Sequence, residues 1–222
     1  MNVIIFGASG MVGAGALLEC LADPRVTSVL VIGRTGCGVT HPQLTEILHH
    51  DFFDYTALQP RLAGLDACLF CLGVSAAGMD EAKYHHLTYD LTLAAARALR
   101  SLNPGLTFCY ISGAGTDSTE RGRNMWARVK DKTENALLAL PFKAAFMFRP
   151  GYIQPMKGVQ TKVTLYKAVY AVLSPLYPIL RRLSPRSFTT SVNVGRALIN
   201  VVDRGYPRNI LVTDDINRAA ES

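Results

Sequence analysis

The stretch that decides the fold is VIIFGASGMVG, residues 3–13. Its first four residues are apolar and too few for a helix, and a glycine-rich turn follows them at once. A segment with apolar residues at helical spacing then continues to Asp23-Pro24. This order predicts a buried strand, a tight turn and a helix.

Each glycine of the turn has its own physical use. Gly7 lets the chain leave the strand tightly, Gly10 lets the backbone approach a pyrophosphate, and Gly13 lets the helix lie close to the sheet. The unpaired N–H groups of the helix N-terminus then face the phosphates. Three glycines spaced G-x-x-G-x-x-G could mark only a tight turn, but their place between a strand and a helix favours a dinucleotide site.

Composition predicts one globular domain. The 222 residues are 49% hydrophobic and 18% charged, which suits a single domain over residues 1–222, with a small substrate-side or interface region around residues 152–190. The net charge of +6 fits a phosphate-bearing cofactor or substrate, and the basic, aromatic face that nucleic-acid binding needs is missing. Five cysteines, mostly in apolar segments without a signal peptide before them, favour a reducing cytoplasm.

The residue after the second predicted strand, Val29–Gly33, indicates the cofactor. NAD sites carry an acidic side chain about 20 residues past the glycines, whereas an arginine there can hold a 2′-phosphate. This position is Arg34, followed by Thr35, and it predicts NADP in preference to NAD. The alternative is an ordinary loop arginine.

The next two predicted strands also end in candidate site residues. Residues 44–49 run into His50-Asp51-Phe52, where an acid and an aromatic could bind and cover an adenine. Adjacent strand residues point to opposite faces, so His49, His50 and Asp51 make a poor metal cluster, and we expect no metal. Residues 66–73 place Leu72 and Gly73 at the carboxyl edge of the sheet. The same geometry makes the C-x-x-C pair in this strand a packing pair.

The remaining chain alternates helices with strands. We expect helices over residues 54–65, 80–102, from about Trp126 to Pro141, and 189–203, and strands over residues 106–112, 144–148 and 210–212. This alternation predicts an α/β fold with a doubly wound, mainly parallel sheet of about seven strands.

These motifs together resemble an atypical member of the short-chain dehydrogenase/reductase superfamily, which has a Rossmann-type fold. The resemblance rests on the glycine turn, the Leu72-Gly73 strand end, Ser112, Lys130 and Arg149-Pro150-Gly151. Within the superfamily the sequence looks most like the Tat-interacting-protein-like oxidoreductases and the related NAD-dependent epimerase/dehydratase-like proteins. The likeness covers about residues 1–215.

The resemblance implies roles for particular residues. Ser112 would hydrogen-bond a substrate carbonyl, and Lys130 would hold the nicotinamide ribose. Arg34 would approach the adenosine ribose. The other implied cofactor contacts are, at the pyrophosphate, Gly7, Ser9, Gly10, Met11, Val12 and Gly13; at the adenine, Asp51 and Phe52; at the adjoining ribose, Leu72 and Gly73; and at the nicotinamide, Pro150, Gly151, Tyr152 and Ile153.

The sequence departs from the superfamily at the proton donor. The usual motif is Tyr-x-x-x-Lys, in which the phenol transfers a proton, whereas this chain has Trp126-x-x-x-Lys130. An indole N–H does not ionise near neutral pH, so Trp126 cannot replace the phenol. We expect an NADP-dependent oxidoreductase acting on a small carbonyl or hydroxyl substrate, with a non-standard donor among Tyr84, Tyr110, Tyr152, His85 or water. The alternative is a regulatory or interaction protein that binds NADP(H) without turnover.

Residues 164–183 form an apolar stretch interrupted by Pro175 and Pro178 and followed by Arg181-Arg182. Its uncharged part is too short to span a membrane. It is expected to line the cleft of a hydrophobic substrate or to form a homodimer contact. The sharper interpretation is a helix lying in a membrane interface.

Overall fold

The computed structural model describes residues 1–159 and 185–222. Its centre is a seven-stranded sheet in the order β3-β2-β1-β4-β5-β6-β9, in which all neighbouring strands are parallel. The strands are β1 (Asn2–Phe6), β2 (Ser28–Gly33), β3 (Leu44–Leu48), β4 (Ala67–Phe70), β5 (Thr107–Ile111), β6 (Ala144–Arg149) and β9 (Ile210–Val212). The order reverses between β1 and β4, which is the switch point where open α/β sheets bind ligands. The expected Rossmann-type fold is confirmed.

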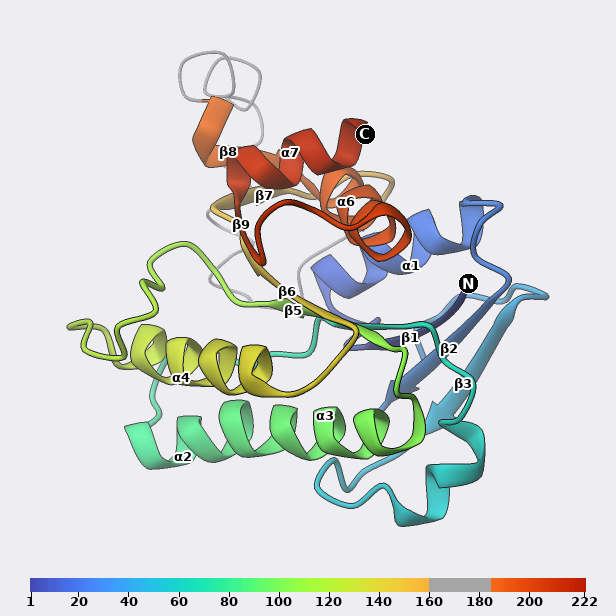
Figure 1. Cartoon of the computed structure of the whole chain (residues 1–222), viewed down its shortest axis with the longest axis horizontal. Coiled ribbons are helices and arrows are strands. Elements are labelled where there is room, and N and C mark those ends of the chain that lie inside the picture. Colours follow the sequence, from blue (N-terminus) through green and yellow to red (C-terminus); the bar gives the residue numbers. More distant parts are fainter. Residues whose placement is uncertain (160–184) are drawn as a thin grey trace.

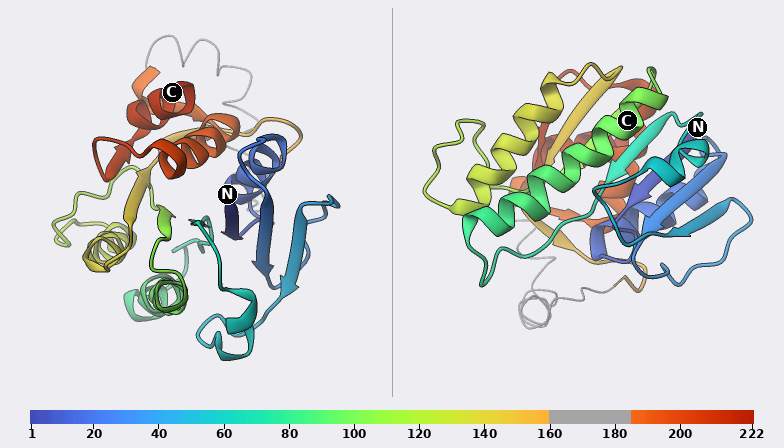
Figure 2. Two further views of the ribbon diagram at one scale, coloured as in Figure 1. Left: turned by 45° about the vertical axis from the view of Figure 1, so that its right-hand side comes forward. Right: turned by 90° about the horizontal axis from the view of Figure 1, so that it is seen from below.

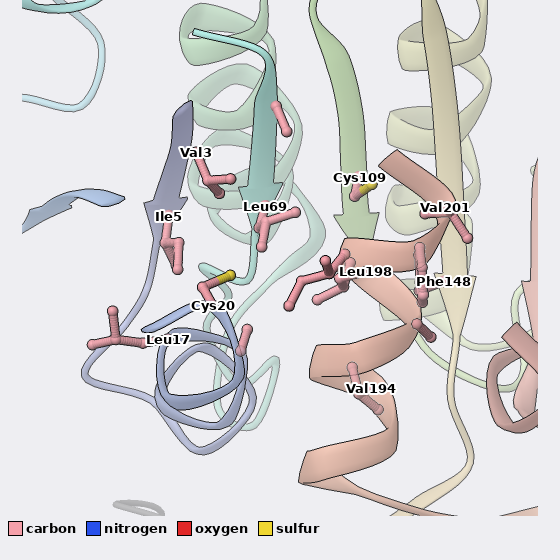
Figure 3. Packing of buried hydrophobic residues seen from close by; sticks show 14 of the residues in the cluster. Val3, Ile5, Leu17, Cys20, Leu69, Cys109, Phe148, Val194, Leu198 and Val201 are labelled. Carbon is pink, nitrogen blue, oxygen red and sulfur yellow. The ribbon is translucent and has the colours of Figure 1, made fainter. Parts of the chain in front are cut away.

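Helices cover both faces of the sheet (Figures 1 and 2). One layer holds α1 (Met11–Ala22), α6 (Ser191–Arg204) and α7 (Thr213–Glu221). The other holds α2 (Glu81–His85), α3 (Leu91–Leu102) and α4 (Met125–Ala139). Alternate strand residues supply the two cores: Val3 and Ile5 pack beneath α1 and α6, as Figure 3 shows, whereas Ile4 and Phe6 face the opposite layer.

Small residues let α1 approach the rest of the fold closely. A Cβ atom at Gly13 would lie 2.2 Å from the carbonyl oxygen of Gly7, and one at Gly15 would lie 2.8 Å from the Cβ of Ser191 in α6. A Cβ at Gly195 would lie 2.7 Å from a side-chain carbon of Glu19. The close packing of α1 on the turn and on α6 therefore requires glycine at positions 13, 15 and 195.

Three expected helices differ from the structure. Residues 54–65 contain only a short 3-10 turn, η1 (Thr56–Arg61), because Pro60 lacks an N–H group and restricts the residue before it. The helix expected over residues 80–102 has a π-helical turn, η2 (His86–Asp90), between α2 and α3. The closing helix begins at Ser191, because the two preceding residues belong to β8 (Phe188–Thr190), which pairs with β7 (Tyr152–Gln154). Helix α7 was not expected.

The cysteines of the C-x-x-C motif belong to opposite sides of the sheet. Cys68 is fully buried in the core facing α3, whereas Cys71 packs against the core beneath α1 and α6. All five cysteines are free thiols. Burial raises the pKa of Cys71 to about 12. This placement agrees with a packing role.

The apolar stretch 164–183 lies outside the described residues, so its roles as cleft wall, dimer contact or interfacial helix stay predictions. Across residues 1–159 and 185–222, no helix combines the length and the apolar character that crossing a membrane requires. The organisation as one domain with a small region around residues 152–190 also stays a prediction.

We expect Gly13→Ala to lower the free energy of unfolding by about 2 kcal/mol or more, because the new methyl group must displace the backbone of the glycine turn. Urea denaturation provides the measurement. Gly105→Ala is the matched control, since nothing lies within 4 Å of a Cβ atom there. Equal effects of the two substitutions would contradict the close approach.

Candidate functional site

The glycine turn presents backbone donors at the carboxyl end of β1. Gly7 has a φ of +82°, and a Cβ atom there would lie 2.7 Å from the backbone of Leu72. Gly10 precedes α1 without a side-chain cap, and its N–H donates to the carbonyl of Gly7 at 2.9 Å. The next three N–H groups, those of Met11, Val12 and Gly13, have no acceptor within the helix. They are suited to bind an anion.

A cavity of about 480 Å³ lies beside this turn. It opens at the carboxyl ends of β1 and β2, and its volume is in the usual range for small-molecule sites. The lining residues are Gly7, Ala8, Ser9, Val31, Ile32, Gly33, Arg34, Thr35, His50, Phe52 and Leu72. The structure thus brings together five predicted cofactor residues, namely Gly7, Ser9, Arg34, Phe52 and Leu72.

The segment after β3 contributes an aromatic wall. Phe52 is 5% exposed and its ring packs edge-on against Phe6, with 6.3 Å between centroids. Asp51 does not line the cavity; its carboxylate accepts a hydrogen bond from the N–H of Phe53 at 2.9 Å. His50, which the sequence offered only as a poor metal ligand, lines the cavity instead. Among the described residues, no cluster of three or more His, Cys, Asp or Glu side chains could hold a metal ion.

Ser112 follows β5, but its hydroxyl is already engaged. It donates towards the carboxylate of Glu134 and lies 3.1 Å from the carbonyl oxygen of Phe148. Glu134 is fully buried and forms a bidentate ion pair with Arg149, in which Nε of Arg149 lies 3.0 Å from Oε2 of Glu134. Because both neighbours of Ser112 accept only, its single proton is held by the protein. Its lone pairs can still receive a hydrogen bond from a ligand.

Lys130 lies one helical turn from Trp126 on α4 and reaches the end of β5. Its Nζ donates to the carbonyl oxygens of Ser112 at 2.7 Å and Ile111 at 3.2 Å. The ammonium group also lies 5.6 Å from the centre of the Tyr110 ring. Burial lowers the pKa of Lys130 to about 8, with the nearby Glu134 opposing that shift.

Trp126 packs against the loop that follows Ser112. A Cβ atom at Gly115 would lie 3.2 Å from the indole ring, and one at Gly113 would lie 3.7 Å from it. The residue in the Tyr position of the motif therefore does face the end of β5. It presents a ring that does not ionise, and this ring packs on Gly113 and Gly115.

The other proton-donor candidates lie in different surroundings. Tyr84 and Tyr110 are 2% and 1% exposed, and burial raises the pKa of Tyr110. Tyr152 donates to the side chain of Gln154 at 3.0 Å. His85 lies 3.6 Å from Asp90 on the α2 side of the molecule.

The turn after β6 holds the predicted nicotinamide contacts. Pro150 and Gly151 connect β6 to β7, which begins at Tyr152, and Ile153 is buried within β7. The N–H of Gly151 donates to the Thr213 hydroxyl at 2.8 Å. Gly73 lies directly beyond Leu72, with nothing within 4 Å of a Cβ atom built on it.

No sequence pattern predicted the buried carboxylate of Asp131. Asp131 is fully buried and accepts hydrogen bonds from the N–H groups of Asp117 and Ser118 at 2.9 and 3.1 Å. Its second oxygen has no partner among the described residues, and burial raises its pKa. Glu134 was detectable in principle, because it lies four residues after Lys130 and so on the same helix face.

Comparisons with known proteins show solved structures that share the fold of this chain. No protein-family model matches the chain. The enzyme WbmF of Bordetella bronchiseptica, solved with NAD+, superposes with a TM-score of 0.67 at 16% identity, covering 99% of this chain and 77% of that one. The dTDP-glucose 4,6-dehydratase DesIV of Streptomyces venezuelae, solved with NAD, gives a TM-score of 0.64 at 15% identity, with coverage of 99% and 80%. These similarities show that the chain shares the Rossmann-type fold of these proteins.

Curated relatives share more sequence with this chain than these solved structures do. It is 30% identical over 159 residues to the mitochondrial protein fmp52 of Emericella nidulans, covering 68% of this chain and 66% of the relative. It is 27% identical over 167 residues to the mitochondrial protein FMP52 of Saccharomyces cerevisiae, with coverage of 72% and 68%. The chain spans about two thirds of the length of these relatives.

These relatives correct one expectation and leave another as it was. The prediction of a cytoplasmic location is wrong, because the Fmp52 relatives are named as mitochondrial proteins. Free cysteines and a reducing environment do not distinguish the cytoplasm from other reducing compartments. The narrower likeness to the Tat-interacting-protein-like oxidoreductases stays a prediction.

We expect Lys130→Met to stabilise the protein near neutral pH and to lose that advantage at high pH. The folded-state pKa of about 8 is below the unfolded value, so the unfolded chain binds more protons between about pH 8 and 10.5, and wild-type stability rises with pH there. The difference between wild type and variant should change by roughly 1 to 3 kcal/mol across this window.

Urea denaturation at several pH values measures this difference. The control is Lys132→Met, since Lys132 is exposed on the same helix. A difference that does not vary with pH would show that Lys130 keeps its ordinary pKa.

Proposed function

We propose that this protein binds NADP(H) along the carboxyl edge of its sheet and acts as an oxidoreductase on a small carbonyl or hydroxyl substrate. The observation that carries the proposal is the continuous cavity between the glycine turn and Arg34. The donors of the first turn of α1 suit the pyrophosphate, and the apolar wall of Phe52 and Leu72 suits the adenosine.

The charge of the cavity supports NADP over NAD. Its lining contains Arg34 and His50 and no aspartate or glutamate. An NAD site holds the ribose hydroxyls with a carboxylate, whereas a 2′-phosphate requires cationic and hydroxyl donors. Arg34 and Thr35 supply these donors together at the end of β2.

The other end of the site supports a reaction. Bound NADPH would supply a hydride, so the chain must provide the matching proton. We assign the proton to Lys130, because its pKa of about 8 is close to neutrality and its amine lies at the end of β5. Ser112 would accept a hydrogen bond from the hydroxyl group of an alcohol substrate or product, and Pro150-Gly151 would border the nicotinamide.

A second candidate function is an NADP(H)-responsive binding protein without turnover. Two observations favour it: Trp126 stands where a phenol is usual, and the Ser112 hydroxyl is held by Glu134. This alternative keeps the whole cofactor site and lacks the proton-transfer step. Binding without turnover would distinguish it from the enzyme.

We expect calorimetric titration to give tight NADPH and weak NADH binding to the wild type. In Arg34→Asp, NADPH affinity should fall at least about a hundredfold, because one charge-assisted contact is replaced by a repulsion. NADH affinity should change much less. Arg97→Asp is the control, since Arg97 is exposed on α3, outside the cavity.

Two results would count against these assignments. Equal losses for both cofactors would remove Arg34 from the phosphate contact. No binding of either cofactor to the wild type would overturn the proposed function.

We expect Trp126→Tyr to increase NADPH consumption with small carbonyl substrates, because a phenol beside Lys130 can transfer a proton. Gly113→Ser/Trp126→Tyr should increase it further by placing a hydroxyl beside the new ring. Trp126→Phe is the control, since it changes ring size without adding a proton donor. Equal rates for the Tyr and Phe variants would show that residue 126 does not face the reacting group.

A further inference from the structure

A second cavity lies at the carboxyl ends of β5, β6 and β9. Its volume is about 280 Å³. The lining residues are Ala114, Gly115, Thr116, Arg149, Gly151, Arg186, Ser187, Val212 and Thr213. It shares Gly151 with the proposed nicotinamide contacts, and its Ala114–Thr116 wall belongs to the loop on which Trp126 packs. It is therefore next to the place proposed for hydride transfer.

Arg149 has one nitrogen left for this cavity. Its residue is only 9% exposed, and Nε and Nη2 are directed at Glu134, with Nη2 also 2.6 Å from the Ser118 hydroxyl. Nη1 makes no hydrogen bond to a described residue, yet it is not among the fully buried unpaired nitrogens. The exposed part of this side chain therefore includes the two N–H groups of Nη1, which have no partner among the described residues. Arg149 lines the cavity.

Two further donors stand at the same cavity. Arg186 is exposed and forms no ion pair within residues 1–159 and 185–222, so its charge is not balanced as that of Arg149 is by Glu134. The Thr213 hydroxyl accepts from the N–H of Gly151, and its own proton goes to no described residue. No aspartate or glutamate lines the cavity.

We propose that this cavity binds an anionic group of the substrate, a carboxylate or a phosphate, between Arg149, Arg186 and Thr213. A planar guanidinium with a free edge, a second guanidinium and a hydroxyl donor match the oxygens of either anion. The inference rests on the proposed function, since it places the anionic end of the substrate beside the reacting carbon near Gly151. It makes the substrate a small acid with a carbonyl or hydroxyl group, rather than a wholly apolar molecule.

The test uses inorganic phosphate and acetate as probes, titrated into the full chain and followed by the NMR signals of the Gly115, Gly151 and Thr213 amides. Saturating NADPH is present so that the glycine turn does not bind the probe. We expect both anions to shift these signals, and Arg186→Gln to weaken binding about tenfold through loss of a charged contact. Arg97→Gln is the matched control and should bind as the wild type does.

The outcomes separate this inference from the proposed function. Titration of the Arg34→Asp variant with phosphate and acetate, without NADPH, tests the anion site in a chain whose cofactor binding is impaired. If the wild type binds no NADPH but binds the anions in a way that depends on Arg186, the anion site is supported and the dinucleotide function is overturned. Tight NADPH binding, with no shift at these amides or an equal shift in Arg186→Gln, would overturn the anion site alone.

Discussion

The close approach of α1 to the end of β1 is the contact on which the site depends. It exists because Gly13 has no side chain to meet the carbonyl of Gly7, 2.2 Å from where a Cβ atom would stand. The same turn places three N–H groups at the switch point of the sheet and forms one wall of the larger cavity. The proposed cofactor binding and the helix packing therefore both require the same backbone atoms of this turn to be free of side chains.

The two ends of the candidate site use charge differently. At the β1–β2 end, Arg34 lies in a cavity that no aspartate or glutamate lines, so its charge is available to a ligand. At the β5–β6 end, Glu134 balances Arg149 and holds the proton of Ser112. Breaking such a buried pair leaves an uncompensated charge, which is costly. At this end the Glu134–Arg149 ion pair fixes the side chains, and only Nη1 of Arg149 is left for a ligand.

Local signals explain which parts of the structure could be predicted. The glycine turn, Arg34 and the parallel strands follow from residues adjacent in sequence, and the structure contains them. The direction of the Asp51 side chain could not be predicted, because it depends on the turn in which the Phe53 N–H donates to its carboxylate. Helix α7 was missed because its polar sequence carries few apolar residues before Ile216. In the Ser112–Glu134–Arg149 group, Glu134 contacts one residue 22 positions before it and one 15 positions after it, and no periodic pattern predicts the direction of such side chains.

The glycine contacts between α1 and α6 bear on how the chain folds. Gly15 meets Ser191, and Glu19 packs against Gly195, so α1 completes its packing only against α6, which is far from it in the sequence. Contacts of such long sequence separation close late, because the entropy of a large loop must be lost first. The glycine turn therefore precedes a helix whose packing is complete only once α6 has docked on it.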